Sequence, residues 1–396
     1  MDLIRLLLIT TIATIIPGQL TRLPVVPLGA ISPTDIAVFI TVMSFLLYTF
    51  LSKKALIFPK KIILTGLIFF LTAMASIVLA LNNFSPDQVL ASSLFLIRFI
   101  LYFLIIVVTV NVVESDKIDK WLSAFLFIGF IFTLIGILQI ILIPDLSFLT
   151  VYGWDPHVNR LASSLLDPNF SGGLLTIFFS IAITFYLFKK KKNYFFAAAV
   201  FFTAIILTFS RSSYLAVMTA VFVIGLVKSP KIILIAMLLF LIIAISSNKV
   251  RDRILGVIAI DQTAQARIES WQNGILIFRQ NPILGVGFNT YRFAQEKYGY
   301  FSFDNPQGGH SGSGSDSSLV LIAATTGILG FTVFLLLLFQ IIQFITKNIT
   351  YDYVPLISTA SLLAILVHSQ FVNSLFYPQI MIAVWFLIGL TYSRNN

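Results

Sequence analysis

The sequence predicts an all-α polytopic membrane protein with about 12 transmembrane helices and one long extracytoplasmic loop. Of its 396 residues, 58% are hydrophobic and 11% are charged, whereas soluble domains carry about 25% charged residues. The apolar residues gather in runs long enough to cross about 30 Å of hydrocarbon. Because these runs lack the alternation of a membrane strand, we expect helices and not a barrel.

The predicted spans form a single transmembrane domain over residues 1–396. They lie at about residues 2–17, 34–51, 62–81, 94–113, 121–143, 171–188, 194–209, 213–227, 231–246, 318–345, 354–372 and 376–393. The first run lacks a basic n-region and an A-x-A cleavage site, so we expect a retained span and not a removed signal.

Lysines predict the orientation. If both termini are cytoplasmic, the inner loops hold every lysine except Lys249 and Lys297, in agreement with the positive-inside rule. Removing one span would place the KKKK run at 189–192 on the outer side. We therefore expect a multi-pass protein of the cytoplasmic (inner) membrane, in contact with membrane lipids. We attribute the net charge of +10 to topology and not to nucleic-acid binding.

Arginines show the opposite distribution, with only Arg5 and Arg394 on the inner side. The others lie on the outer side or near the outer ends of spans: Arg22, Arg98, Arg160, Arg211, Arg251, Arg253, Arg267, Arg279 and Arg292. Topology alone predicts the depletion of arginine there. Because the guanidinium fork suits phosphate and carboxylate oxygens, we expect a site for an anionic ligand on the outer face.

Residues 247–317, between the ninth and tenth spans, form the predicted extracytoplasmic loop. Within it we expect an amphipathic helix over 263–280 and a short helix over 289–298, both at the membrane interface. The first of these helices is predicted by apolar residues spaced three and four apart: Ile268, Trp271, Ile275 and Phe278.

Three outer arginines are the main candidates for anion binding. Arg160 precedes an Asp-Pro-Asn turn in which Asn169 or Ser171 can cap the next helix; the turn leaves Arg160 without a partner. Arg211 lies in TFSRSS, between two spans that almost no loop separates, where a hairpin needs no charge. Arg267 begins the amphipathic helix and could equally be a solvated surface residue.

Arg98, Arg292 and His368 are weaker candidates. Arg98 lies just inside the outer end of the fourth span. An ionisable residue there is a functional candidate, or it forms a structural pair with Asp87 or Asp35. We interpret Arg292 more readily as a solvated residue and His368 as the donor or acceptor of a structural hydrogen bond.

The Gly/Ser tract at 308–318 holds two candidate catalytic bases, His310 and Asp316. Either side chain can take a proton from an acceptor hydroxyl. Asp316 could instead cap the following helix, and His310 could be solvated. The chain has no cysteine and only three histidines, which excludes a thiolate site and argues against a histidine cage. We therefore expect no metal and no cofactor.

Four segments carry a family resemblance. They are RLASSLLDPNFSGG (160–173), LTFSRSSYLAV (207–217), RIESWQNGILIFRQNPILGVGFNTY (267–291) and DSSLVLIAATTGILG (316–330). In this order, and with a long outer loop before the tenth span, the chain resembles the O-antigen ligase and polysaccharide polymerase superfamily of membrane glycosyltransferases. The resemblance covers residues 150–345 well and the first four spans only by architecture.

The resemblance implies a metal-independent glycosyltransferase that takes a glycan from an undecaprenyl-diphosphate carrier at the outer face of the cytoplasmic membrane. A hydroxyl of a glycan acceptor, which is a lipid-linked chain or a lipid core sugar, attacks the sugar C1 and the lipid diphosphate leaves. Arg211 and Arg267 resemble the arginines that hold the diphosphate in this family. Arg160 matches the family's arginine before the Pro-Asn turn.

One position departs from the family pattern. Ligases of the family carry a histidine, then Asn, Ser or Gln, then nine residues and GxxG. In this chain Gly327 and Gly330 form the GxxG, and Asp316 followed by Ser317 stands at the histidine position. Either Asp316 is the base, or His310 has taken that role, or the hydroxyl is activated more weakly. An acidic residue at this position resembles the polymerases, which favours a polymerase over a ligase proper.

Two other classes of function fit the sequence less well. A transporter or flippase would place ionisable groups near the bilayer midplane, often in repeated halves, whereas in this chain they gather at one face. A non-catalytic scaffold for polysaccharide assembly would leave glycan output unchanged when Arg211 or Arg267 is replaced.

Overall fold

The computed structural model describes residues 1–25, 29–302 and 314–395. In these ranges the chain is predominantly helical, so the predicted all-α class is confirmed. They also contain a small antiparallel sheet of β1 (Leu23–Val25) and β2 (Gly29–Ile31), in which Leu23 pairs with Ile31.

Helices make up most of the described chain. In chain order, the α-helices are α1 (Asp2–Ala13), α2 (Pro33–Ser52), α3 (Lys60–Ala80), α4 (Pro86–Val112), α5 (Ile118–Leu142), α6 (Pro168–Lys189), α7 (Lys192–Leu207), α8 (Arg211–Lys228), α9 (Pro230–Ser246), α10 (Asn248–Ile258), α11 (Gln262–Gln280), α12 (Tyr291–Lys297), α13 (Ser318–Ile345), α14 (Tyr353–His368) and α15 (Pro378–Asn395). Short 3-10 helices are η1 (Ser115–Lys117), η2 (Ser147–Tyr152), η3 (Ser163–Leu165) and η5 (Ser374–Phe376).

A helix forms at each of the twelve predicted spans, but not every helix has the dimensions of a span. In the described ranges, seven helices are long and apolar enough to cross a membrane, or up to eight if α9 and α10, bent by 104°, count as one. α7 and α14 are apolar but shorter, and α1 has only 12 residues, about 18 Å of helix. The chain is an integral membrane protein, while the number of about 12 spans stays a prediction.

The first predicted span is only partly helical because the chain turns after Ala13. Gly18 adopts a φ of +53°, which residues with a Cβ rarely adopt. It lies against Ser164, and the next amide, that of Gln19, donates a hydrogen bond to the Ser164 carbonyl at 2.8 Å. The end of the α1 segment is thereby attached to the loop between α5 and α6.

α6 is the most buried of the span-length helices, since 78% of its most apolar 18-residue stretch is buried. It packs against α7, α8 and α14. A Cβ at Gly172 of α6 would lie 2.0 Å from the Ser213 Oγ of α8, so the glycine lets the two helices approach closely. Because Gly172 lies near the start of α6 and Ser213 near the start of α8, this contact brings the 160–173 and 207–217 segments together. α9, by contrast, has no buried residue.

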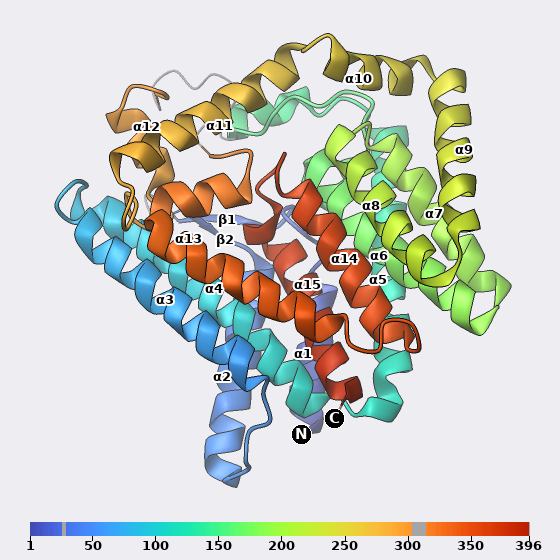
Figure 1. Cartoon of the computed structure of the whole chain (residues 1–396), viewed down its shortest axis with the longest axis horizontal. Coiled ribbons are helices and arrows are strands. Elements are labelled where there is room, and N and C mark those ends of the chain that lie inside the picture. Colours follow the sequence, from blue (N-terminus) through green and yellow to red (C-terminus); the bar gives the residue numbers. More distant parts are fainter. Residues whose placement is uncertain (26–28, 303–313, 396) are drawn as a thin grey trace.

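α10, α11 and α12 cross one end of the bundle, between α9 and the start of α13 (Figure 1). The predicted helices over 263–280 and 289–298 correspond to α11 and α12. The side of α11 that packs inside the protein holds Gly274 and Ile277, which are buried, while Ile268 and Ile275 of the predicted apolar face are exposed. The reason is close packing, because a Cβ at Gly274 would lie 2.3 Å from Val320 of α13.

α13 is broken in its first half by Gly327, which has a φ of 64° and a ψ of −169°. The segment after α11 pairs with this break through its main chain. The amide of Ile328 donates to the Pro282 carbonyl at 2.8 Å, and the amide of Val286 donates to the Ala324 carbonyl at 3.0 Å. Unpaired backbone groups cost several kcal/mol in an apolar medium, so this pairing makes the break tolerable.

We expect Gly327→Ala to lower the melting temperature of the purified protein in detergent more than Gly299→Ala. Both glycines have positive φ, 64° and 74°, so both alanines carry backbone strain, on the order of 1–3 kcal/mol. Only at Gly327 does the new Cβ also meet backbone atoms, 2.3 Å from the carbonyl of Ile283; at Gly299 nothing lies within 4 Å. Equal melting temperatures would contradict the importance of the paired break.

Candidate functional site

The loop before α6 places Asp167 at the start of that helix. Its carboxylate accepts hydrogen bonds from the amides of Asn169 (2.6 Å) and Phe170 (3.3 Å), so Asp167 is the cap and the predicted caps, Asn169 and Ser171, are wrong. Its other oxygen lies 3.9 Å from the His157 Nε2. Burial opposes the ionisation of Asp167, but the neighbouring His157 and Arg160 and the hydrogen bond from the Asn169 amide outweigh burial and lower its pKa.

Arg160 braces the turn between α7 and α8. Its Nε donates to the Thr208 carbonyl at 2.9 Å and its second terminal nitrogen to the Phe209 carbonyl at 3.4 Å. The remaining nitrogen lies 3.5 Å from the His157 Nδ1. Burial and the nearby Arg253 lower the pKa of Arg160 to about 10, which leaves it charged at neutral pH. Arg160, for which the sequence indicated no partner, is therefore bound to the main chain just before Arg211.

Arg211 is the first residue of α8 and makes a two-point contact with Asp261. Its two terminal nitrogens donate to the two Asp261 oxygens, each at 3.0 Å. The Arg211 side chain is 9% exposed and that of Asp261 35%. Asp261 also caps α11 by accepting from the Ala264 amide at 2.9 Å. Partial burial opposes the ionisation of Asp261, but these hydrogen bonds lower its pKa.

A chain of buried polar groups connects the starts of α6 and α8 with the end of α14. The Ser210 Oγ donates to the Asn169 side chain at 2.8 Å and lies 3.0 Å from the Ser212 Oγ. Ser212 in turn lies 3.3 Å from the Nε2 of His368, whose Nδ1 pairs with Ser374. His368 is fully buried and both ring nitrogens have hydroxyl partners, as its structural interpretation requires.

Arg267 and Asp316 form the second half of the site. Burial raises the pKa of Asp316 to about 6, and Arg267 is the positive charge that opposes this increase. Burial lowers the pKa of Arg267, while Asp316 opposes that decrease. The Asp316 amide donates to the Ser270 Oγ at 3.0 Å, which ties the loop before α13 to α11.

Asp316 does not cap α13. The cap is Ser317, whose Oγ accepts from the Val320 amide at 3.3 Å. The alternative that Asp316 serves as a helix cap is therefore wrong, and its carboxylate is free of that task. His310 lies outside the described residues, so its role as a base stays a prediction.

The two weaker arginines have other partners. Arg98 forms a salt bridge with Asp35 at 2.9 Å, one of its two predicted partners, and donates to the Ala30 carbonyl at 2.8 Å. Arg292 lies in α12 with its guanidinium 4.7 Å from the ring centre of Phe293, and burial lowers its pKa.

An open cavity of about 370 Å³ lies beside the Arg211–Asp261 pair. Its lining is Val158, Asn159, Arg160, Phe209, Lys249, Asp252, Arg253 and Asp261. Arg267 and Asp316 do not line this cavity. They are coupled to it by charge, since Arg211, Asp167 and Asp261 are among the groups that shift the pKa of Arg267. The three candidate arginines thus share one electrostatic environment without lining one common cavity.

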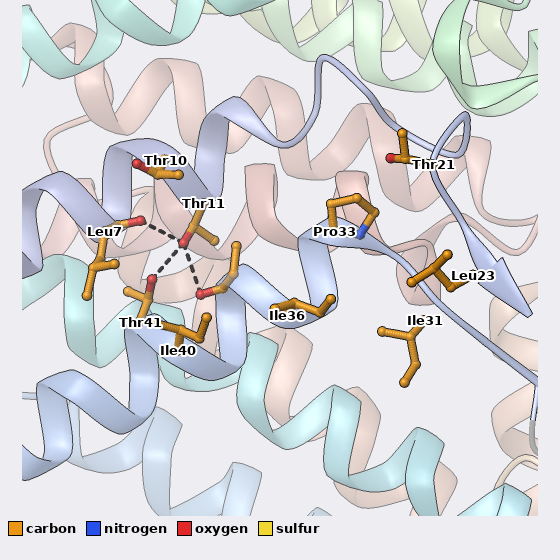
Figure 2. Close-up of a pocket in the computed structure, with 11 residues that line it drawn as sticks. Leu7, Thr10, Thr11, Thr21, Leu23, Ile31, Pro33, Ile36, Ile40 and Thr41 are labelled. Atoms are coloured by element: carbon orange, nitrogen blue, oxygen red, sulfur yellow. Dashed lines mark hydrogen bonds between the residues drawn. The ribbon is translucent and has the colours of Figure 1, made fainter. Parts of the chain in front are cut away.

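An apolar groove of about 250 Å³ lies between α1, the β1–β2 sheet and α2 (Figure 2). Two of its threonines satisfy their hydroxyl groups internally: the Thr11 Oγ1 donates to the Leu7 carbonyl at 2.7 Å and lies 2.7 Å from the Thr41 Oγ1. The loop that follows α1 is attached to Ser164, next to the segment that carries Arg160.

Two residues of this arrangement were not predicted. His157 precedes Arg160 by three residues, and its spacing to Asp167 was a signal that sequence reasoning overlooked. Asp261 lies fifty residues from Arg211, and the only local signal was its position before a predicted helix. Its contact with Arg211 depends on the bend between α9 and α10.

Comparison with known proteins identifies one domain. Residues 196–335 match the family model described as O-antigen ligase. The match runs from α7 into α13 and includes Arg211, Asp261, Arg267 and Asp316. No curated protein matches the chain.

Proposed function

We propose that this chain, an integral membrane protein of the O-antigen ligase and polysaccharide polymerase superfamily, transfers or polymerises glycans from an undecaprenyl-diphosphate carrier. The proposed location is the outer face of the cytoplasmic membrane, with both termini cytoplasmic and residues 247–317 outside. The observation that carries the proposal is the set of charged groups within the matched domain: Arg211 and Arg267 share one electrostatic environment with the carboxyl group of Asp316.

In the proposed reaction, Arg211 and Arg267 bind the diphosphate, and Arg160 holds the turn that presents Arg211. A guanidinium fork matches phosphate oxygens in two places. Charge builds up on the diphosphate as the bond to the sugar breaks. Donors already oriented toward that charge stabilise the transition state more than the ground state.

The acceptor hydroxyl oxygen forms the new bond to the sugar C1, the bond from C1 to the diphosphate oxygen breaks, and the hydroxyl proton moves to a base. Asp316 is our first candidate for that base and His310 the second. A carboxyl group with a pKa of about 6 is mostly ionised at neutral pH, yet it holds a proton better than an ordinary aspartate. The proposal needs no metal and no cofactor.

The polyprenyl chain of the carrier needs an apolar surface next to the diphosphate. The groove between α1 and α2 (Figure 2) has an apolar lining, and the chain that follows α1 is hydrogen-bonded to Ser164, four residues after Arg160. We propose it as the place where the chain enters the protein.

A polymerase is slightly favoured over a ligase proper. The support is Asp316, which stands where ligases of the family carry histidine and which does not serve as a helix cap. The acceptor is then a lipid-linked glycan chain; for a ligase it is a sugar of a lipid core.

We expect Arg211→Lys to lower the rate of glycan transfer by about 10–100-fold, although it keeps the charge, because lysine cannot offer two donors in a plane. The measurement is transfer from purified lipid-linked glycan in proteoliposomes. Arg279→Lys is the matched control, since Arg279 is exposed at the end of α11. Wild-type rates for Arg211→Lys would argue against a two-point contact with phosphate.

We expect the transfer rate to rise with pH through about 6, because only ionised Asp316 can accept a proton and burial raises its pKa to about 6. Asp316→Asn should remove this dependence together with most of the activity. The measurement is the pH profile of the wild type, Asp316→Asn and His310→Ala. A profile unchanged in Asp316→Asn but lost in His310→Ala would assign the base to His310.

We expect cells that lack the protein to accumulate short, unpolymerised glycan units on the carrier lipid. The measurement is the length distribution of glycans on the carrier and on the final acceptor. Long chains stranded on the carrier would instead identify a ligase.

A further inference from the structure

The cavity beside Arg211 is lined by three cations, Arg160, Lys249 and Arg253, and by two carboxylates, Asp252 and Asp261. Two of its lining residues, Lys249 and Arg253, come from α10 and face the same space as Arg160. No salt bridge in the described ranges involves either of them. Lys249 lies with its Nζ 5.5 Å from the ring centre of Phe209, and Arg253 is close enough to lower the pKa of Arg160.

Arg211 does not line this cavity, but it is hydrogen-bonded to Asp261, which does. The carboxylate accepts two hydrogen bonds from the guanidinium, both at 3.0 Å, and a phosphate also binds arginine in this two-point way. Arg211 is almost buried, whereas Asp261 is a third exposed and lines the cavity. An anion that enters the cavity therefore meets Asp261 before it meets Arg211.

The residues around Asp261 favour its contact with Arg211. A Cβ at Gly256 would lie 2.4 Å from the Asp261 carboxylate and 3.4 Å from the Arg211 guanidinium, so the glycine leaves room for the ion pair. Ile260, just before Asp261, has a φ of 48°, which is unusual for a β-branched residue. Such strain persists only where the surroundings enforce it.

We propose that this cavity binds the diphosphate of the carrier lipid, with Lys249 and Arg253 as additional ligands, and that Asp261 occupies the phosphate position on Arg211 until the diphosphate displaces it. This inference rests on the proposed function for the identity of the ligand. It adds a binding role for α10 and a competing carboxylate within the protein. Once Asp261 is displaced, Arg160, Lys249, Arg253 and Arg211 offer four positive groups, which suits the two phosphates of a diphosphate better than a monophosphate.

The first test removes the competitor. We expect Asp261→Asn to bind farnesyl diphosphate at least about tenfold more tightly than the wild type, by titration calorimetry on the full-length protein in detergent. Asparagine caps a helix about as well as aspartate, so α11 keeps its cap and only the charge is lost. Melting temperatures verify that the variant is folded.

Asp252→Asn is the matched control for charge. Asp252 lines the same cavity and forms no salt bridge in the described ranges, so its replacement changes the charge of the cavity by the same amount without freeing Arg211. We expect less than about a threefold change in affinity. An equal gain in both variants, or no gain in Asp261→Asn, overturns the displacement of Asp261.

The second test addresses the ligands on α10. We expect Arg253→Gln and Lys249→Gln each to weaken farnesyl diphosphate binding at least about fivefold. Arg251→Gln is the control, since Arg251 lies on the same helix, is exposed and does not line the cavity. Equal affinities for the Arg251 and Arg253 variants overturn the subsite.

Two further probes define what the cavity recognises. Inorganic pyrophosphate should compete with farnesyl diphosphate, and farnesyl monophosphate should bind at least about tenfold more weakly. Equal binding of the monophosphate overturns a diphosphate subsite. Because these measurements do not depend on transfer, the two proposals fail separately: active transfer with unchanged binding in all variants overturns only this inference, and the expected binding pattern without transfer overturns only the proposed function.

Discussion

The broken backbone of α13 is the constraint on which the rest of the site depends. An interrupted helix within an apolar bundle needs partners for the amides and carbonyls that it no longer pairs internally. The segment after α11 supplies them through Pro282 and Val286. As a result the end of α11 is fixed against α13, and the two elements that carry Arg267 and Asp316 keep a constant relation. The GxxG of the sequence thus permits the break in α13 to which the segment after the amphipathic helix α11 is hydrogen-bonded.

Backbone strain marks the other half of the site. Leu166, Phe209 and Ile260 all have positive φ, of 58°, 47° and 48°, and each stands directly before a residue of the site or its cap: Asp167, Ser210 and Asp261. Left-handed conformations of such residues cost about 1–3 kcal/mol each. Arg160 donates hydrogen bonds to the carbonyls of Thr208 and Phe209, in the turn between α7 and α8. These bonds offset part of that cost and give the buried charge of Arg160 a structural role.

Sequence reasoning located the helices and the charged segments because both follow from local physics. Apolar runs become helices, and the cost of placing arginine near the membrane made Arg160 and Arg211 stand out before any contact was known. The number of spans could not be obtained in the same way, since α1 stops at Ala13 where the chain turns toward Ser164. The side of α11 that packs against α13 could not be foreseen, because its closest contact is made by Gly274, which carries no hydrophobic signal.

The partners of the charges were beyond local reasoning. Asp261 meets Arg211 because α10 bends by 104° away from α9, and nothing in either segment specifies that angle. The choice of Asp167 as cap, and of Ser317 in place of Asp316, depends on which oxygen the chain brings within reach of a free amide. The caps are local contacts, whereas the Arg211–Asp261 contact is tertiary.

The Arg211–Asp261 pair also bears on how a catalytic cycle would end. In the proposed reaction the diphosphate gains negative charge when its bond to the sugar breaks, and a site that only attracts it would retain it. The fold holds the Asp261 carboxylate next to the guanidinium, so its local concentration is always high. It would therefore bind Arg211 again as soon as the diphosphate begins to dissociate. The same contact that weakens binding would thereby speed the departure of the product.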